Sequence, residues 1–104
     1  MNDELFAQVK RKLNITWDDE DTNNRLEDII NSAISFLLNR LGIADPAFDF
    51  SAAGDENTLF KNYCLYEYNH ILSEFFVNYA ELLDSTRARH EVAYFIMSEA
   101  GADE

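Results

Sequence analysis

The stretch from Leu59 to Leu83 limits the possible folds of this chain more than any other segment. It reads LFKNYCLYEYNHILSEFFVNYAELL, 25 residues without Gly or Pro. On a helix that turns about 100° per residue, its apolar side chains gather in one broad arc. That arc is wider than the roughly 100° stripe that an ordinary surface helix needs. We therefore expect a long central helix over residues 59–83 that packs against more than one neighbour.

Two further helices are expected before this stretch. Residues 2–13 have a repeating apolar face, with acids near the start and basic residues in the last turn, as the helix dipole favours. The next segment begins with Thr16-Trp17-Asp18-Asp19, which fits the [ST]-x-x-[DE] capping box with Thr16 as N-cap. Its apolar residues repeat every three to four positions as far as Leu41, and Gly42 stands where a C′ glycine belongs.

Residues 42–55, GIADPAFDFSAAGD, are predicted to form a long loop between the second and third helices. Phe48 and Phe50 are apolar, so parts of this loop should fold back onto the helices. The N-cap of the third helix is expected among three residues of suitable type, Ser51, Asp55 and Asn57.

The C-terminal segment permits two interpretations. Ala88, Val92, Phe95, Ile96 and Met97 could share the face of a fourth, shorter helix. The run VAYFIM could equally form a strand that pairs with another chain. The helix is the favoured interpretation, and residues 101–104 are expected to form a frayed tail.

Composition favours an all-α fold. The chain has 104 residues, of which 47% are hydrophobic, with three Gly and one Pro. A β-sandwich or barrel needs more turn residues than this. We expect one domain over residues 1–100, built as a small bundle of three to four helices around the long central one. No apolar run is long enough to span a membrane, and the charged, amphipathic N-terminus does not read as a secretion signal.

The net charge of −12 comes from 8 Lys and Arg against 20 Asp and Glu. The acid is concentrated in the connections and the tail, whereas the one basic cluster is Lys10-Arg11-Lys12. A surface that grips phosphates needs clustered Lys and Arg, so sequence-specific nucleic-acid binding is not expected. The candidate acidic surface comprises Asp18, Asp19, Glu20, Asp21, Asp45, Asp49, Asp55 and Glu56.

None of the catalytic or metal-binding patterns considered is complete. A calcium loop that starts at Asp19 lacks the required Gly and the final Glu. Glu67-x-x-His70 has the spacing of di-iron bundles, but those sites need two such pairs and two more Glu. The single cysteine, Cys64, lies in the apolar arc and is interpreted as a buried core thiol. We expect neither an enzyme nor a cofactor.

Three residues beside the main apolar arc are candidates for a subunit contact. Tyr63, Tyr66 and Val77 lie off the arc that the first two helices should cover. Tyrosine is favoured where one side of the ring is apolar and the other is wet, as at a protein interface. The sequence therefore predicts that this flank meets a neighbouring chain.

The order and spacing of several segments resemble the head–tail connector proteins of long-tailed bacteriophages. These are small head-completion or DNA-packaging adaptors, often found in prophage genomes. The likeness covers roughly residues 5–90. It depends on VKRKLNI, TWDDEDTNNRLEDIINSAISFLLNRLG, a loop containing FDFS, and LYEYNHILSEFFVNYAELL.

The resemblance implies a helical protein without enzymatic activity that assembles into a ring, commonly twelve-fold. Such a ring docks under the portal protein after DNA packaging and supports the next stopper or tail-completion protein. It would lie at the head–tail junction of the virion after assembly in the bacterial cytoplasm, with the genome passing through its lumen. The acids named above could line that lumen, since acidic surface does not grip DNA. Whether the ring forms in solution or only on the portal is left open.

An alternative of another class is an acidic regulatory module that mimics DNA or binds a basic host protein. The small size and the net charge of −12 favour it. A mimic needs ordered carboxylates at phosphate-like spacing, whereas an adaptor needs an exposed apolar flank.

Overall fold

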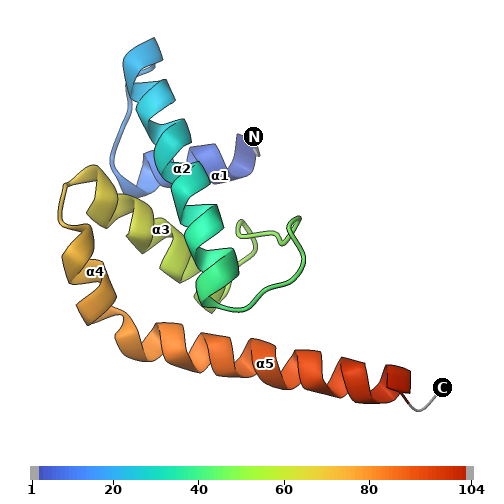
Figure 1. The fold of residues 1–104 in the computed structure, drawn as a ribbon. Helices are drawn as coiled ribbons and strands as arrows, with labels where there is room; N and C mark the ends of the chain where they lie inside the picture. The colour runs from blue at the N-terminus through green and yellow to red at the C-terminus, as the bar shows by residue number, and fades with distance from the viewer. Residues whose placement is uncertain (1–2, 103–104) are drawn as a thin grey trace.

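The computed structural model describes residues 3–102, with the backbone alone described at positions 94, 95 and 97–102 (Figure 1). This part of the chain contains five helices and no strand, so the all-α prediction is confirmed. The strand alternative for VAYFIM is wrong, because a helix runs through it. The helices are α1 (Asp3–Lys12), α2 (Glu20–Arg40), α3 (Asp55–Tyr68), α4 (Leu72–Asn78) and α5 (Ala80–Ala102).

The first helix is confirmed to within one residue at each end, whereas the start of the second differs from the prediction. Asp19 rather than Thr16 is the N-cap of α2, because its Oδ1 accepts a hydrogen bond from the backbone N–H of Thr22 at 2.9 Å. The hydroxyl of Thr22 also donates to Asp19 Oδ2, at 2.7 Å, and accepts from Trp17 Nε1. These contacts hold the residues before the helix in place, and the backbone of Asp19 itself is extended.

Both α1 and α2 end in the same way, with one residue in left-handed conformation. Asn14 has φ 59° after α1, and Gly42 has φ 68° after α2. The next N–H in each case donates back across the last turn, from Ile15 to the carbonyl of Lys10 and from Ile43 to that of Leu38, both at 2.9 Å. This is the Schellman arrangement, and it confirms the prediction that Gly42 ends the second helix.

The single central helix predicted over residues 59–83 is wrong, because the chain turns twice within it. His70 takes φ 61°, and the N–H of Ile71 donates to the carbonyl of Tyr66, which closes α3. A second change of direction at Tyr79 separates α4 from α5 (Figure 1). The first turn has a clear physical reason: it brings Phe75 back against Tyr63 and Tyr66 of α3, with ring centroids 5.6 and 5.9 Å apart. The wide apolar arc is therefore buried partly by the segment itself.

Within the described residues, α3 packs against each of the other four helices and so occupies the centre of the fold. Its Leu59, Phe60 and Cys64 have no solvent exposure. The side chains buried around them come from all parts of the chain: Leu5, Val9, Ile15, Leu26, Ile29, Ile30, Ala33, Leu37, Leu41, Phe50, Phe75 and Leu83.

The connection from Leu41 to Gly54 contains turns and folds back onto the helices. Phe50 is buried and stacks on Phe60, with ring centroids 5.8 Å apart. Gly54 is the N-cap of α3, without a side-chain cap, so the prediction of a cap at Ser51, Asp55 or Asn57 is wrong. Asn57 is instead buried, and its Nδ2 donates to Gln8 Oε1 and to the carbonyl of Phe50, both at 2.7 Å. It holds α1, the loop and α3 together.

The last helix is longer than predicted, and only its first part belongs to the core. Leu83 and Thr86 are buried, whereas Val92 and Ile96 are 59% and 60% exposed. Figure 1 shows α5 running past the other helices and away from them, which agrees with dimensions of 54 × 28 × 19 Å. The expected frayed tail lies partly outside the described residues, since α5 includes residues 101–102 and positions 103–104 are not described.

Candidate functional site

The three residues predicted to form a subunit contact do not share one surface. Tyr63 is 6% exposed and stacks on Phe36, with ring centroids 5.4 Å apart. Tyr66 is half-buried, and its hydroxyl accepts a hydrogen bond from Asn78 at 3.2 Å. Val77 is 76% exposed. The Tyr63 ring therefore belongs to the core of its own chain, and Val77 alone is widely accessible to a neighbour.

The turn after Tyr68 exposes apolar side chains that the sequence had assigned to the core. Phe76 is 40% exposed and lies next to Val77 on α4. Ile71, the N-cap residue of this short helix, is 43% exposed. A periodicity argument cannot find them, because it assumes that one helical phase runs through the whole segment. Among the described side chains, the exposed large hydrophobic residues lie on α4 and its N-cap, on the outer part of α5, and before α2 at Trp17.

All the predicted acidic residues except Glu56 are exposed, but they fall into separate groups. Asp18 to Asp21 are exposed just before and in the first turn of α2, whereas Asp45 and Asp49 are exposed in the loop that follows this helix. Hydrogen bonds from Thr22 hold the pKa of Asp19 below its usual value, and those from Ser51 do the same for Asp49. Both side chains therefore shape local turns.

The remaining two predicted acids are already used within the chain. Arg89 of α5 contacts Glu56 at 3.1 Å and Asp55 at 3.7 Å. Glu56 is also 3.4 Å from His90 Nε2. These contacts tie α5 to the start of α3, so Asp55 and Glu56 act first as a clamp between two helices.

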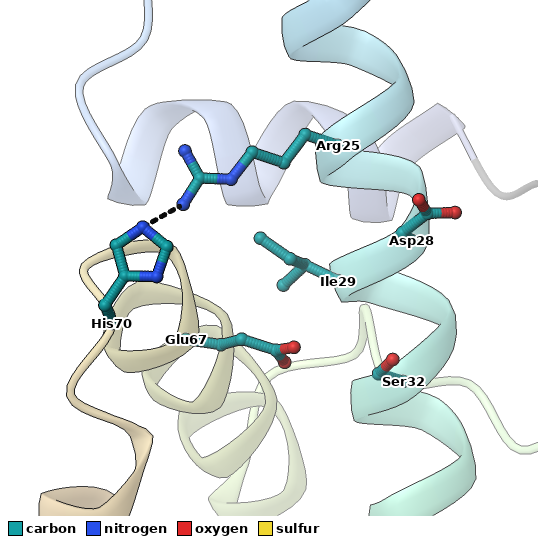
Figure 2. Close-up of a pocket in the computed structure, with 6 residues that line it drawn as sticks. All are labelled: Arg25, Asp28, Ile29, Ser32, Glu67 and His70. Carbon is teal, nitrogen blue, oxygen red and sulfur yellow. Dashed lines mark hydrogen bonds between the residues drawn. The ribbon is translucent and has the colours of Figure 1, made fainter.

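A polar pocket of about 250 Å³ lies between α2 and the end of α3 (Figure 2). Arg25 projects from α2 across the mouth of this pocket, where its guanidinium donates to the carbonyl of Tyr68 at 2.6 Å and lies 3.2 Å from His70 Nε2. The guanidinium also covers the Tyr68 ring, 4.2 Å from its centroid. Glu67 enters from the other side, and Asp28, Ile29 and Ser32 complete the wall.

Burial has the largest effect on the pKa values of three groups beneath this pocket. Desolvation raises the pKa of Glu67 above its usual value, although the hydrogen bond from Tyr63 and the charge of Arg25 oppose the change. Desolvation and the nearby Glu67 raise the pKa of Tyr63 to about 12. Burial also raises the pKa of the Cys64 thiol, which fits a core residue and not an activated nucleophile.

The Glu67-x-x-His70 spacing does not produce a paired ligand set. Glu67 belongs to the last turn of α3, whereas His70 follows the helix in left-handed conformation, so the two side chains do not project from adjacent turns of one helix. Within residues 3–102, no group of three or more His, Cys, Asp or Glu side chains is placed to hold a metal ion.

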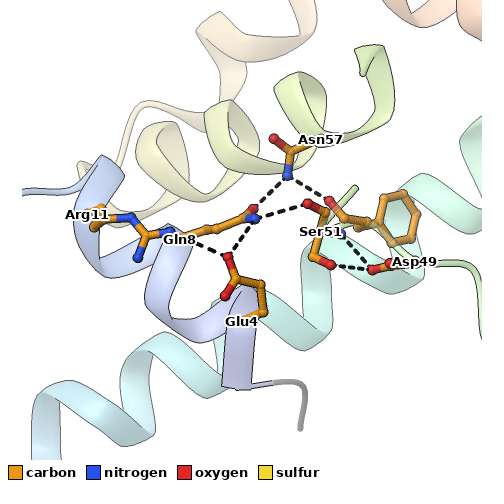
Figure 3. Close-up of polar contacts among 7 residues, drawn as sticks. Glu4, Gln8, Arg11, Asp49, Ser51 and Asn57 are labelled. Carbon is orange, nitrogen blue, oxygen red and sulfur yellow. Dashed lines mark hydrogen bonds and ion pairs between the residues drawn. The ribbon is translucent and has the colours of Figure 1, made fainter. Parts of the chain in front are cut away.

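A second pocket, of about 330 Å³, is basic, and we name it the basic pocket. Three of its side chains come from α1 and one from α3, namely Gln8, Arg11, Lys12 and Lys61. Figure 3 shows how Gln8 is fixed: its amide nitrogen donates to Glu4 at 3.1 Å and to the carbonyl of Ser51 at 3.0 Å, and its oxygen accepts from Asn57. Arg11 lies 3.5 Å from the same Glu4 carboxylate. Sequence reasoning missed this site, because Lys61 joins the other residues only in the fold.

Among the described residues, no helix is both long and apolar enough to cross a membrane. Comparison of the chain with protein-family models, with curated proteins and with solved structures gave no match.

Proposed function

We propose that this chain is a structural adaptor of the bacteriophage head–tail connector type. It assembles with copies of itself into a ring beneath the portal protein and links the phage head to the next stopper or tail-completion protein. Its place is the head–tail junction of the virion, after assembly in the bacterial cytoplasm. DNA passes through the lumen, and the exposed acids before α2 and in the loop after it are the candidates to line that lumen.

The observation that supports this proposal best is the apolar surface that one copy leaves uncovered. Val77 on α4 and Val92 and Ile96 on α5 are each more than half exposed. They lie on two different helices, and α5 carries its share beyond the core (Figure 1). Two separate apolar areas suit head-to-tail association, in which one surface of each copy meets a different surface of the next.

The proposal is tested by the mass of the assembly in solution, measured by light scattering with and without purified portal protein. We expect a ring-sized species in at least one of these conditions. Val77→Asp and Val92→Asp should each weaken assembly at least about tenfold, because a charge buried in an apolar contact is costly. Asn31→Asp adds the same charge at an exposed position on α2 and should assemble like the natural chain.

Two results would count against an adaptor. One is a stable monomer in both conditions, with no binding to the portal. The other is tight binding to a basic DNA-binding protein that Val77→Asp leaves unchanged, which would favour the acidic regulatory module.

A further inference from the structure

Two lysines stand out on this strongly acidic chain because no acid among the described residues forms a salt bridge with them. Of the eight Lys and Arg side chains, six make a salt bridge or a hydrogen bond to a carbonyl. Within the described residues, Lys12 and Lys61 are the two that make neither. Both line the basic pocket, together with Arg11. Positive charge is therefore concentrated at one place, on a protein whose net charge is −12.

The pocket has the size and rigidity to receive an acidic side chain. Its volume of about 330 Å³ exceeds that of one Glu side chain, and the three cations come from two helices packed against each other. Gln8 in its wall is held by hydrogen bonds to α1, the loop and α3 (Figure 3). A site built from fixed elements loses less conformational entropy when a partner arrives.

A complementary surface lies on α4 and at the start of α5 of the same chain. Glu74 and Glu81 are exposed and make no salt bridge within the described residues. Glu74 precedes Val77 by three residues, which places the two on one side of α4. Glu81 follows Val77 by four residues, across the turn at Tyr79. We name these three residues the acidic face.

Among the described residues, the other exposed acids match this combination less well. Glu27 and Asp28 on α2 lie between Leu26 and Ile29, which are buried, so the apolar residues next to them in sequence are not exposed. Glu20 and Asp21 lie in the first turn of α2, where the helix dipole already stabilises their charge. The acidic face instead combines unpaired carboxylates with Val77, the most exposed large hydrophobic residue of the described chain.

We propose that the acidic face of one copy docks on the basic pocket of the next copy. This inference rests on the ring-forming function proposed above and names the contact that sets the order of subunits. The two surfaces differ, so the contact is heterologous and can repeat around a closed ring. Charges at the rim chiefly set register and association rate. DNA is a weaker candidate, since three cations on a chain of net charge −12 provide little phosphate affinity.

A charge exchange between two variants tests this contact. Lys12→Glu/Lys61→Glu makes the pocket acidic, and Glu74→Lys/Glu81→Lys makes the face basic. Each variant alone should associate at least about tenfold more weakly than the natural chain, because like charges then meet in every contact. An equimolar mixture should recover association, since every contact in an alternating ring again joins opposite charges. Sedimentation velocity at low salt, with and without purified portal protein, measures the association of each variant and of their mixture.

The matched control is Glu20→Lys/Glu27→Lys, which has the same net charge as the altered face but lies on α2. This control keeps both natural surfaces, so it should associate by itself like the natural chain. When it is mixed with Lys12→Glu/Lys61→Glu, it should not draw that variant into the assembly. Thermal melts by circular dichroism verify that each variant folds, as expected for replacements at exposed or half-buried positions.

The possible results distinguish a failure of this docking contact from a failure of the adaptor function on which it rests. If the natural chain forms rings and the charge variants form them equally well, the docking proposal is wrong while the adaptor function stands. If neither the natural chain nor the mixture associates, with or without the portal, both are wrong. If the natural chain binds a DNA duplex that Lys12→Glu/Lys61→Glu no longer binds, the pocket is a phosphate site and the docking proposal is overturned.

Discussion

Single residues in left-handed conformation decide where three of the helices end. Each is followed by an isoleucine whose N–H donates back across the last turn at 2.9 Å. Gly takes this conformation without strain, and Asn takes it more readily than most residues, so two of the three ends could be predicted. His70 lies inside a run without Gly or Pro whose apolar pattern favours one continuous helix, and the break after α3 was therefore missed. The three residues are Asn14, Gly42 and His70.

Glu67 gives a prediction at the scale of one titrating group. Its pKa is raised by burial, so folding favours the protonated form. Its contribution to stability is therefore fully present below the unfolded pKa of about 4.5 and is lost as pH rises through the higher folded pKa. Glu67→Gln cannot ionise and should be more stable than the natural chain at pH 7, with a difference that shrinks towards pH 4. Urea unfolding across this range measures the difference.

Tyr63→Phe supplies the control for this prediction. The Tyr63 hydroxyl lowers the pKa of Glu67, so its removal should move that pKa further up, as an NMR titration of the carboxyl carbon would show. Arg25, Asp28 and His70 also line the pocket that Glu67 enters, and they remain unchanged in both variants. A stability difference that stays constant between pH 4 and 7 would show that this carboxylate is hydrated equally in the folded and unfolded chain.

At the scale of helices, the sequence predicted α1, α2 and the all-α class because local signals agree there. Apolar spacing, dipole-matched charges and Gly42 all indicate the same elements. Residues 59–83 lack such agreement, since a straight helix satisfies the local pattern while tertiary packing favours a fold-back. Packing Phe75 against two rings of α3 stabilises the fold, but the spacing of apolar residues along the sequence does not reveal this contact. The same turn decides which residues are exposed: of Tyr63, Tyr66 and Val77, it leaves only Val77 widely accessible. The subunit contact itself stays a prediction.

The neighbouring residues Phe75 and Phe76 test how α4 is held. Phe75 is buried and contacts four other rings, those of Tyr63, Tyr66, Phe76 and Tyr79. Phe75→Ala should lower the free energy of unfolding by about 3–5 kcal/mol. Phe76→Ala removes a ring that is 40% exposed and should cost about 1 kcal/mol. Chemical denaturation compares the two. Equal losses would contradict the fold-back of α4 onto α3.

At the scale of the whole molecule, repulsion among the acidic side chains is the main electrostatic effect. A net charge of −12 is spread over a body 28 Å by 19 Å in its shorter dimensions. Each salt bridge of a Lys or Arg among the described residues has at least one well-exposed partner, and such pairs contribute little each. Repulsion acts over the whole surface and should therefore outweigh them at low salt.

We accordingly expect the melting temperature of the isolated chain to rise with added sodium chloride. The Debye length falls from about 30 Å at 0.01 M to about 8 Å at 0.15 M, which screens charges across the body. Scanning calorimetry measures the rise, and choline chloride at equal ionic strength should reproduce it if screening is the cause. A melting temperature that falls with salt would show that the intramolecular ion pairs dominate instead.

The direction of α5 has a mechanical consequence. The twelve residues from Glu91 to Ala102 span about 18 Å of helix beyond the clamp between Arg89 and Glu56. A rotation of about 10° about that clamp swings the far end by about 3 Å, while the core residues around α3 stay in place. The overhang is thus an arm that is joined to the core at one end. In the adaptor proposed above, such an arm would let neighbouring subunits meet at slightly different spacings without repacking their interiors.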